Sequence, residues 1–102
     1  MAKFGLYAKL ISQPGQRDAL IEVLLDAARA LSKTPDCELY IVNVLGDEPN
    51  AVWVTEVWVD QTAHAASLQD EEIRSIVQRG TPLVAEFSQQ VRLTPVGGKG
   101  LS

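Results

Sequence analysis

Three residues with chemically useful side chains lie close together near the middle of the chain: Glu56, Trp58 and His64. A carboxylate and an imidazole are groups that often move protons in enzymes, and an indole ring can flank a flat ligand. Glu56 and Trp58 are two residues apart, so in an extended strand both side chains point to the same face. We therefore expect Glu56, Trp58 and His64 to share one small-molecule site.

Further candidates come from two other predicted strands. Tyr40 and Tyr7 each bring a phenolic hydroxyl into a strand, and Asn43 interrupts an apolar face. Each candidate also has a structural interpretation, such as a core tryptophan, a carboxylate paired with Arg or Lys, or a surface histidine. Their clustering favours a binding site. We predict that Trp58 and His64 are catalytic. We predict that four further residues bind substrate: Tyr7, Tyr40, Asn43 and Glu56.

The sequence lacks the residues that other common sites need. One His and one Cys are too few for a typical zinc site. Cys37 has no second cysteine to pair with and no histidine nearby in sequence, which predicts a reduced structural thiol. The glycine-rich sequence at 97–100 has no helix after it to receive a phosphate. We therefore expect no metal site and no phosphate-binding loop.

Size and charge narrow the range of partners. We expect residues 1–102 to form a single domain with a flexible tail at 97–102. The nine basic residues are scattered and the net charge is −4, which argues against nucleic acid or an anionic membrane as partner. The N-terminus has no signal-peptide core, and no apolar run approaches the ~20 residues that span a bilayer, so a cytoplasmic protein is expected.

Hydrophobic periodicity and turn residues divide the chain into seven elements. We predict strands at 3–12, 37–45, 51–59 and 86–96, and helices at 16–33, at 61–68 and from about 70 to 80. The order β-α-β-β-α-α-β is typical of an α+β fold, namely a ferredoxin-like four-stranded antiparallel sheet with helices on one face.

The strands at 37–45 and 51–59 are mostly apolar on both faces, although helices can cover only one of them. The other face would expose a large apolar patch. The simplest cover is a second copy of the chain, so we predict a homodimer packed sheet against sheet. Trp58 is expected to face the pocket, and Trp53, on the opposite face, is expected to contact the partner subunit.

The central segment 54–68 reads Val-Thr-Glu-Val-Trp-Val-Asp-Gln-Thr-Ala-His-Ala-Ala-Ser-Leu. It resembles the signature of the antibiotic biosynthesis monooxygenase (ABM) domain family, in which a Glu-x-Trp strand precedes a helix with Ala-His-x-x-Ser. The resemblance extends over essentially the whole chain, including the Pro-Gly at 14–15 and the closing Leu-Thr-Pro-Val-Gly-Gly at 93–98. Within this family the chain is most similar to the small quinol monooxygenases.

The resemblance implies a dimeric α+β barrel. For some members it also implies oxidation of a quinol or polyphenol by O₂ without metal, flavin or haem. Trp58 and His64 match the motif, whereas Val54 stands where characterised members often have Asn. Ala66 and Ser67 occupy the helix in which the haem-degrading branch has a Trp, so haem is not expected. The expected function is a cofactor-independent monooxygenase that acts on a small electron-rich aromatic. The alternatives are a small-molecule isomerase and a non-catalytic ligand-binding dimer.

Overall fold

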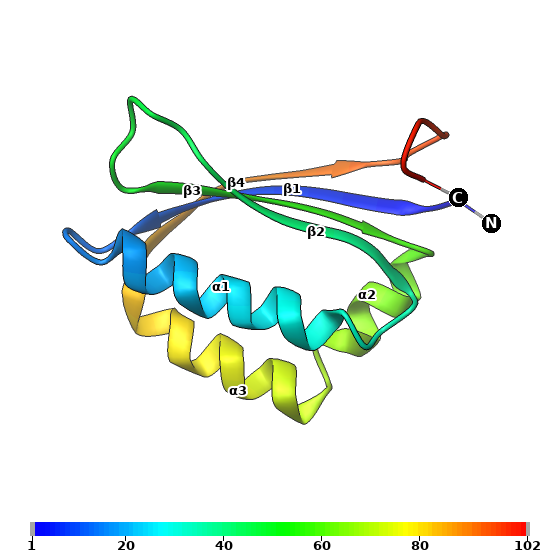
Figure 1. Ribbon diagram of the computed structural model, residues 1–102, viewed down its shortest axis with the longest axis horizontal. Helices are drawn as coiled ribbons and strands as arrows, with labels where there is room; N and C mark the ends of the chain where they lie inside the picture. Colours follow the sequence, from blue (N-terminus) through cyan, green and yellow to red (C-terminus); the bar gives the residue numbers. More distant parts are fainter. Residues whose placement is uncertain (1, 102) are drawn as a thin grey trace.

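The computed structural model describes residues 2–101, and its elements follow the predicted order (Figure 1). The strands are β1 (Phe4–Ser12), β2 (Cys37–Val44), β3 (Ala51–Trp58) and β4 (Val84–Leu93). The helices are α1 (Arg17–Leu31), α2 (Gln61–Ser67), α3 (Glu71–Gly80) and the short 3₁₀ helix η1 (Thr81–Leu83).

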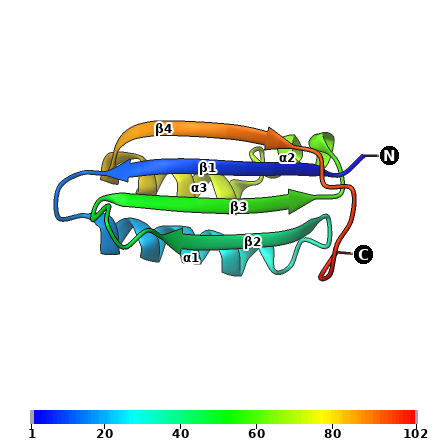
Figure 2. The same ribbon diagram turned by 90° about the horizontal axis from the view of Figure 1, so that it is seen from above.

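The four strands form one antiparallel sheet in the order β2-β3-β1-β4. Figures 1 and 2 show α1, α2 and α3 on the same side of this sheet. This confirms the predicted α+β, ferredoxin-like fold, which is the arrangement of one half of a dimeric α+β barrel. β1 and β3 are the central strands, so the side chains on their helix-facing side are the most deeply covered.

The helix starts agree with the sequence pattern. Asp60 caps α2, because its Oδ1 accepts a hydrogen bond from the backbone N–H of Ala63 at 2.7 Å. Asp70 caps α3 in the same way, through the N–H of Ile73 at 3.1 Å. The last strand begins two residues earlier than predicted, since η1 leads straight into the sheet at Val84.

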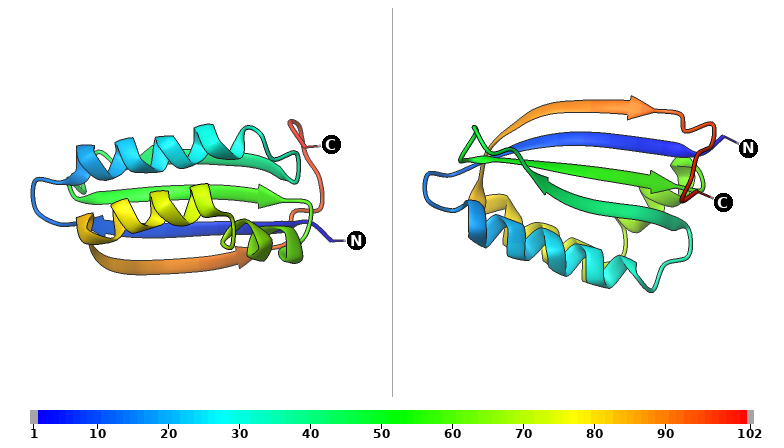
Figure 3. Two further views of the ribbon diagram at one scale, coloured as in Figure 1. Left: turned by 90° about the horizontal axis from the view of Figure 1, so that it is seen from below. Right: turned by 45° about the horizontal axis from the view of Figure 1, so that its top comes forward.

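The core lies between the sheet and the helices (Figure 3). On β3, Val52 and Trp58 face the helices and are 0% and 1% exposed. On α1 the buried residues recur at helical spacing and turn one face of the helix to the sheet: Leu20, Val23, Ala27, Ala30 and Leu31.

Within residues 2–101, no helix covers the other face of the sheet. Tyr7, Ile41, Val91 and Leu93 are each 40% exposed or more on this outer face, and the ring of Trp53 packs against Tyr7 at 5.1 Å. Figure 1 shows the β2–β3 hairpin and the C-terminal segment rising on this side at opposite ends of the sheet. The second apolar face that the sequence predicts for the strands at 37–45 and 51–59 is therefore partly exposed. Ile41 of β2 is 43% exposed, whereas Ala51 and Val57 of β3 are 1% and 7% exposed.

The C-terminal segment leaves the sheet by crossing over Gly5. A Cβ atom at Gly5 would lie 3.2 Å from the carbonyl oxygen of Leu93 and 3.2 Å from Pro95, so a larger residue would push this segment away. Of the predicted tail at 97–102, the segment from Gly97 to Leu101 has no helix or strand, and Ser102 lies outside the described residues.

Candidate active site

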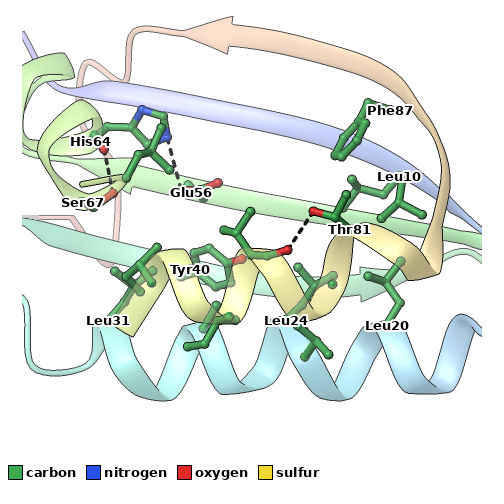
Figure 4. Close-up of a pocket in the computed structure, with 18 of the residues that line it drawn as sticks. Leu10, Leu20, Leu24, Leu31, Tyr40, Glu56, His64, Ser67, Thr81 and Phe87 are labelled. Carbon is green, nitrogen blue, oxygen red and sulfur yellow. Dashed lines mark hydrogen bonds and ion pairs between the residues drawn. The ribbon is translucent and has the colours of Figure 1, made fainter. Parts of the chain in front are cut away.

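A cavity of about 210 Å³ lies between the sheet and the helices. A dry cavity of about 150 Å³ is enough to hold benzene, so this one has room for one substituted ring. Aliphatic side chains supply most of its wall, and Glu56, His64 and Ser67 lie together at one end (Figure 4). The polar side chains that line it are Tyr40, Glu56, His64, Ser67 and Thr81, together with the indole N–H of Trp58.

Glu56 is the central polar group of the cavity. Its Oε1 accepts a hydrogen bond at 2.9 Å from the Nε1–H of Trp58, which lies two residues along β3 on the same face. The Glu56 side chain is only 13% exposed, and this burial raises the pKa of its carboxyl, while the bond from Trp58 opposes the rise. The buried indole therefore holds the carboxylate in place and supplies a fixed donor to it.

His64 approaches Glu56 from α2. The imidazole ring lies 5.0 Å from the ring of Phe4 and 5.5 Å from that of Trp58, so aromatic contacts fix its orientation. Its Nε2 is 3.9 Å from Glu56 Oε1, which is too long for a hydrogen bond. The hydroxyl of a ligand that entered between these two atoms would be able to contact both.

The charge state of His64 follows from its surroundings. Burial lowers the pKa of the imidazole, and the positive charge of Arg92 lowers it further. The contact with Glu56 would be a salt bridge only if the imidazole were protonated, and burial opposes that state. A neutral imidazole beside a carboxyl group can accept a proton, which is the requirement for a general base.

Tyr40 reaches the cavity from β2, where it is the cross-strand partner of Glu56. Burial raises the pKa of its phenol far above the ordinary value, and the charge of Glu56 adds to the effect. The hydroxyl of Tyr40 therefore stays protonated at neutral pH and is available as a hydrogen-bond donor to a ligand.

Asn43 and Tyr7, which the sequence predicted to bind substrate with Tyr40 and Glu56, do not line this cavity and lie on the outer face of the sheet. Asn43 is opposite Trp53 in the sheet, and its Nδ2 donates to the Trp53 carbonyl and to Thr55 Oγ1, both at 3.2 Å. Tyr7 is opposite Thr55, on the outer face. The physical reason is strand alternation, because Asn43 is three residues from Tyr40, and Tyr7 follows Leu6, the residue opposite Glu56.

The structure also adds residues that the sequence interpretation did not name as part of the site. Ser67 lines the cavity, and its hydroxyl donates to the His64 carbonyl at 2.6 Å across one turn of α2. Its place in the Ala-His-x-x-Ser motif could have signalled it. Phe87 lines the opposite end, and no local sequence signal distinguishes it from an outer-face residue.

Among residues 2–101, no group of three or more His, Cys, Asp or Glu side chains is placed to hold a metal ion. In the same part of the chain, no helix is long and apolar enough to cross a bilayer. The cavity itself has an apolar wall and a few polar groups, the usual character of a small-molecule site.

The model of one protein family, antibiotic biosynthesis monooxygenase, matches residues 4–79, which include β1 to β3 and the Glu56–His64 site. The chain belongs to the ABM family. The comparison with curated proteins gives no match. Family membership makes the chain a candidate monooxygenase by family name, and it leaves the substrate open.

Solved structures agree with this assignment. A candidate antibiotic biosynthesis monooxygenase from Chloroflexus aurantiacus is similar at 38% identity, with 98% of this chain and 99% of that chain covered and a TM-score of 0.90. A protein from Shewanella oneidensis has 25% identity over 92% of this chain and 91% of its own, with a TM-score of 0.82. A candidate ABM protein from Caulobacter crescentus, at 19% identity, covers 96% of this chain and 92% of its own with a TM-score of 0.80, and it shows the fold alone.

Proposed function

We propose that this ABM-family chain oxidises a small electron-rich aromatic, a phenol or hydroquinone, with O₂ inside the cavity and without a cofactor. The observation that carries the proposal is the position of Glu56 Oε1. It lies 2.9 Å from the indole N–H of Trp58 and 3.9 Å from His64 Nε2, within an otherwise apolar wall. A phenolic hydroxyl is the group that such a site would orient and deprotonate.

The first step is a proton transfer. Neutral His64 accepts the phenolic proton, and the carboxylate of Glu56 stabilises the imidazolium that forms. Exclusion of water strengthens this interaction, because charges attract more strongly in a medium of low dielectric constant. The product of the step is a phenolate held in an apolar cavity, where it is a better electron donor than the phenol.

The second stage consumes O₂. The phenolate gives one electron to O₂, and the resulting phenoxyl radical and superoxide combine to form a C–O bond at an unsubstituted ring carbon. Loss of the C–H proton from that carbon and cleavage of the O–O bond leave a quinone carbonyl and release water. One oxygen atom enters the ring and the other becomes water, while the aromatic substrate supplies all four electrons. The chain's own contribution is to position the ring, move protons and exclude water.

Oxygen uptake with a panel of small hydroquinones and phenols tests this proposal. With ¹⁸O₂ we expect one labelled atom in the quinone and one in water, with no H₂O₂. His64→Ala should lower kcat/KM by about 100-fold, the usual contribution of a general base. Gln61→Ala, an exposed change on the same helix, is the matched control and should have the activity of the parent. Uptake no faster than autoxidation without protein, across the panel, would reject the proposal.

Proton transfer alone is a second possible function. A carboxyl group with a raised pKa and a neutral imidazole, 3.9 Å apart, also suit the acid and base of an isomerase that moves a proton between carbon atoms. Incorporation of deuterium from D₂O into a bound ketone or enol under argon would identify this activity. Tight binding with neither uptake nor exchange would instead identify a ligand-binding protein.

A further inference from the structure

An irregularity in β4 turns one aromatic side chain into the cavity. Lys9 pairs with Gln89, but the next residue, Leu10, pairs with Phe87, so Ser88 is an extra residue in β4. An extra residue reverses the alternation of side chains on either side of it, and such bulges often lie beside active sites. Without the bulge Phe87 would share the outer face with Gln89. With it, Phe87 lines the cavity next to Leu10 (Figure 4).

Phe87 and the polar groups lie at different levels of the cavity. Glu56 is opposite Leu6 on β1, and Phe87 is opposite Leu10. Those two positions on β1 are four residues apart, which is about 13 Å at the usual rise of about 3.3 Å per residue. Figure 4 shows the same order along the cavity, with His64 at one end and Phe87 at the other.

The Phe87 end is apolar and partly open. Leu10, Leu20 and Leu24 form its wall together with Thr81, and Phe87 is 73% exposed. Val77 on α3 also lines the cavity and is 52% exposed. Among the described lining residues, the ionisable groups are Tyr40, Glu56 and His64, on the polar side. A ligand that covered Phe87 and Val77 would gain the free energy of removing apolar surface from water.

A single ring does not reach both ends. A phenol whose hydroxyl contacts Glu56 and His64 would occupy roughly half of the ~13 Å between the levels of Glu56 and Phe87. The remaining length is mostly apolar, and the Thr81 hydroxyl in it is already used, because it donates to the Val77 carbonyl at 2.8 Å. The shape of the cavity therefore matches a ligand with a hydroxyl at one end of its ring and an apolar extension at the other.

We infer that Phe87 is a specificity-determining residue, which selects phenols that carry an alkyl chain opposite the reacting hydroxyl. The inference rests on the proposed function for the position of the hydroxyl at Glu56 and His64. It adds the substrate class, a ring with an apolar chain of a few carbons, and it assigns the recognition of that chain to the residue that the Ser88 bulge turns inward.

A series of 4-alkylphenols measures this length directly. Dissociation constants would be determined by titration calorimetry under argon, with chains from methyl to heptyl. Each added methylene should lower the dissociation constant about twofold. This is a smaller gain than full burial of a methylene would give, because Phe87 is exposed. The gain should stop near pentyl, where the chain reaches Phe87. Phe87→Ala should weaken binding of 4-pentylphenol about fivefold and leave 4-methylphenol unchanged, because the short ligand does not reach the lost ring.

The matched control is Leu45→Ala, which removes another exposed apolar side chain from the β2–β3 hairpin, away from the cavity. It should bind every phenol as the parent does. If Phe87→Ala lost affinity equally for both phenols, or lost none for either, the role of Phe87 would be overturned.

The binding assay is independent of oxidation. Chain-length selectivity without oxygen uptake would support the role of Phe87 and reject the proposed activity. Oxygen uptake together with dissociation constants that do not change with chain length would support the proposed activity and reject the role of Phe87.

Discussion

The hydrogen bond between Trp58 and Glu56 can be measured by replacing both partners. Trp58→Phe removes the donor at 2.9 Å from a carboxylate that is 13% exposed. A hydrogen bond to a charged group contributes about 1.5–3 kcal/mol, and the smaller ring leaves unfilled volume at a site that is 1% exposed, for about 1 kcal/mol more. We therefore expect a loss of about 3 kcal/mol in the free energy of unfolding at pH 8. For a domain of this size that lowers Tm by on the order of 15 °C.

The double variant gives the sharper result. Glu56→Met alone leaves the indole N–H of Trp58 buried without its acceptor, which costs about 1–3 kcal/mol. Combining it with Trp58→Phe removes both polar groups, so the two losses should not add. The double variant should be about as stable as Trp58→Phe alone, with a coupling energy of about 2 kcal/mol. Urea unfolding of the four proteins measures this cycle. Trp53→Phe on the outer face is the control, with an expected loss below about 1 kcal/mol. Additive losses, with a coupling near zero, would refute the reasoning.

Three further predictions concern charge, the thiol and assembly. The pKa of Glu56 is raised in the folded chain, so its contribution to stability is present at acid pH and is lost as pH rises through that folded-state pKa. From pH 4 to pH 8, the free energy of unfolding of Glu56→Gln in urea should therefore rise relative to that of the parent. A difference between the two proteins that stays constant with pH would contradict this. Burial raises the pKa of Cys37 from 9.0 to about 11, so a disulfide reagent at pH 8 should label it about 100-fold more slowly than a free thiol, whereas labelling at the free-thiol rate would show an activated cysteine. We propose that a second copy covers the outer face. Sedimentation should then show a dimer that Trp53→Glu converts to a monomer, and a monomeric parent would rule this out.

Most of the fold could be predicted because local signals agreed with one another. Hydrophobic periodicity and turn residues are sufficient to place the element order, and the structure adds an aspartate cap at the start of α2 and of α3. Alternation also puts Glu56 and Trp58 on one face, which the structure bears out with a direct hydrogen bond. These features depend on residues close together in the chain.

The parts of the site that could not be predicted depend on how strands align with one another. Alternation shows that Tyr40 and Asn43 lie on opposite faces of β2, but only the pairing of Tyr40 with Glu56 shows which of them shares the cavity. The pairing of β1 with β3 likewise shows that Tyr7 lies on the outer face, outside the cavity. Phe87 depends on the bulge at Ser88, which has no glycine or proline to mark it, so a regular strand would place this ring on the outer face.

The central claim is that the Glu56–His64 end of the cavity activates a phenolic hydroxyl for reaction with O₂. The most direct test is ¹⁸O₂ consumption with an alkyl-substituted hydroquinone, measured in parallel for the parent, His64→Ala and the exposed control Gln61→Ala. We predict one labelled oxygen atom in the product per O₂ consumed, at a rate that falls about 100-fold in His64→Ala and not at all in the control. Equal rates in all three proteins, or a product without the label, would contradict the claim.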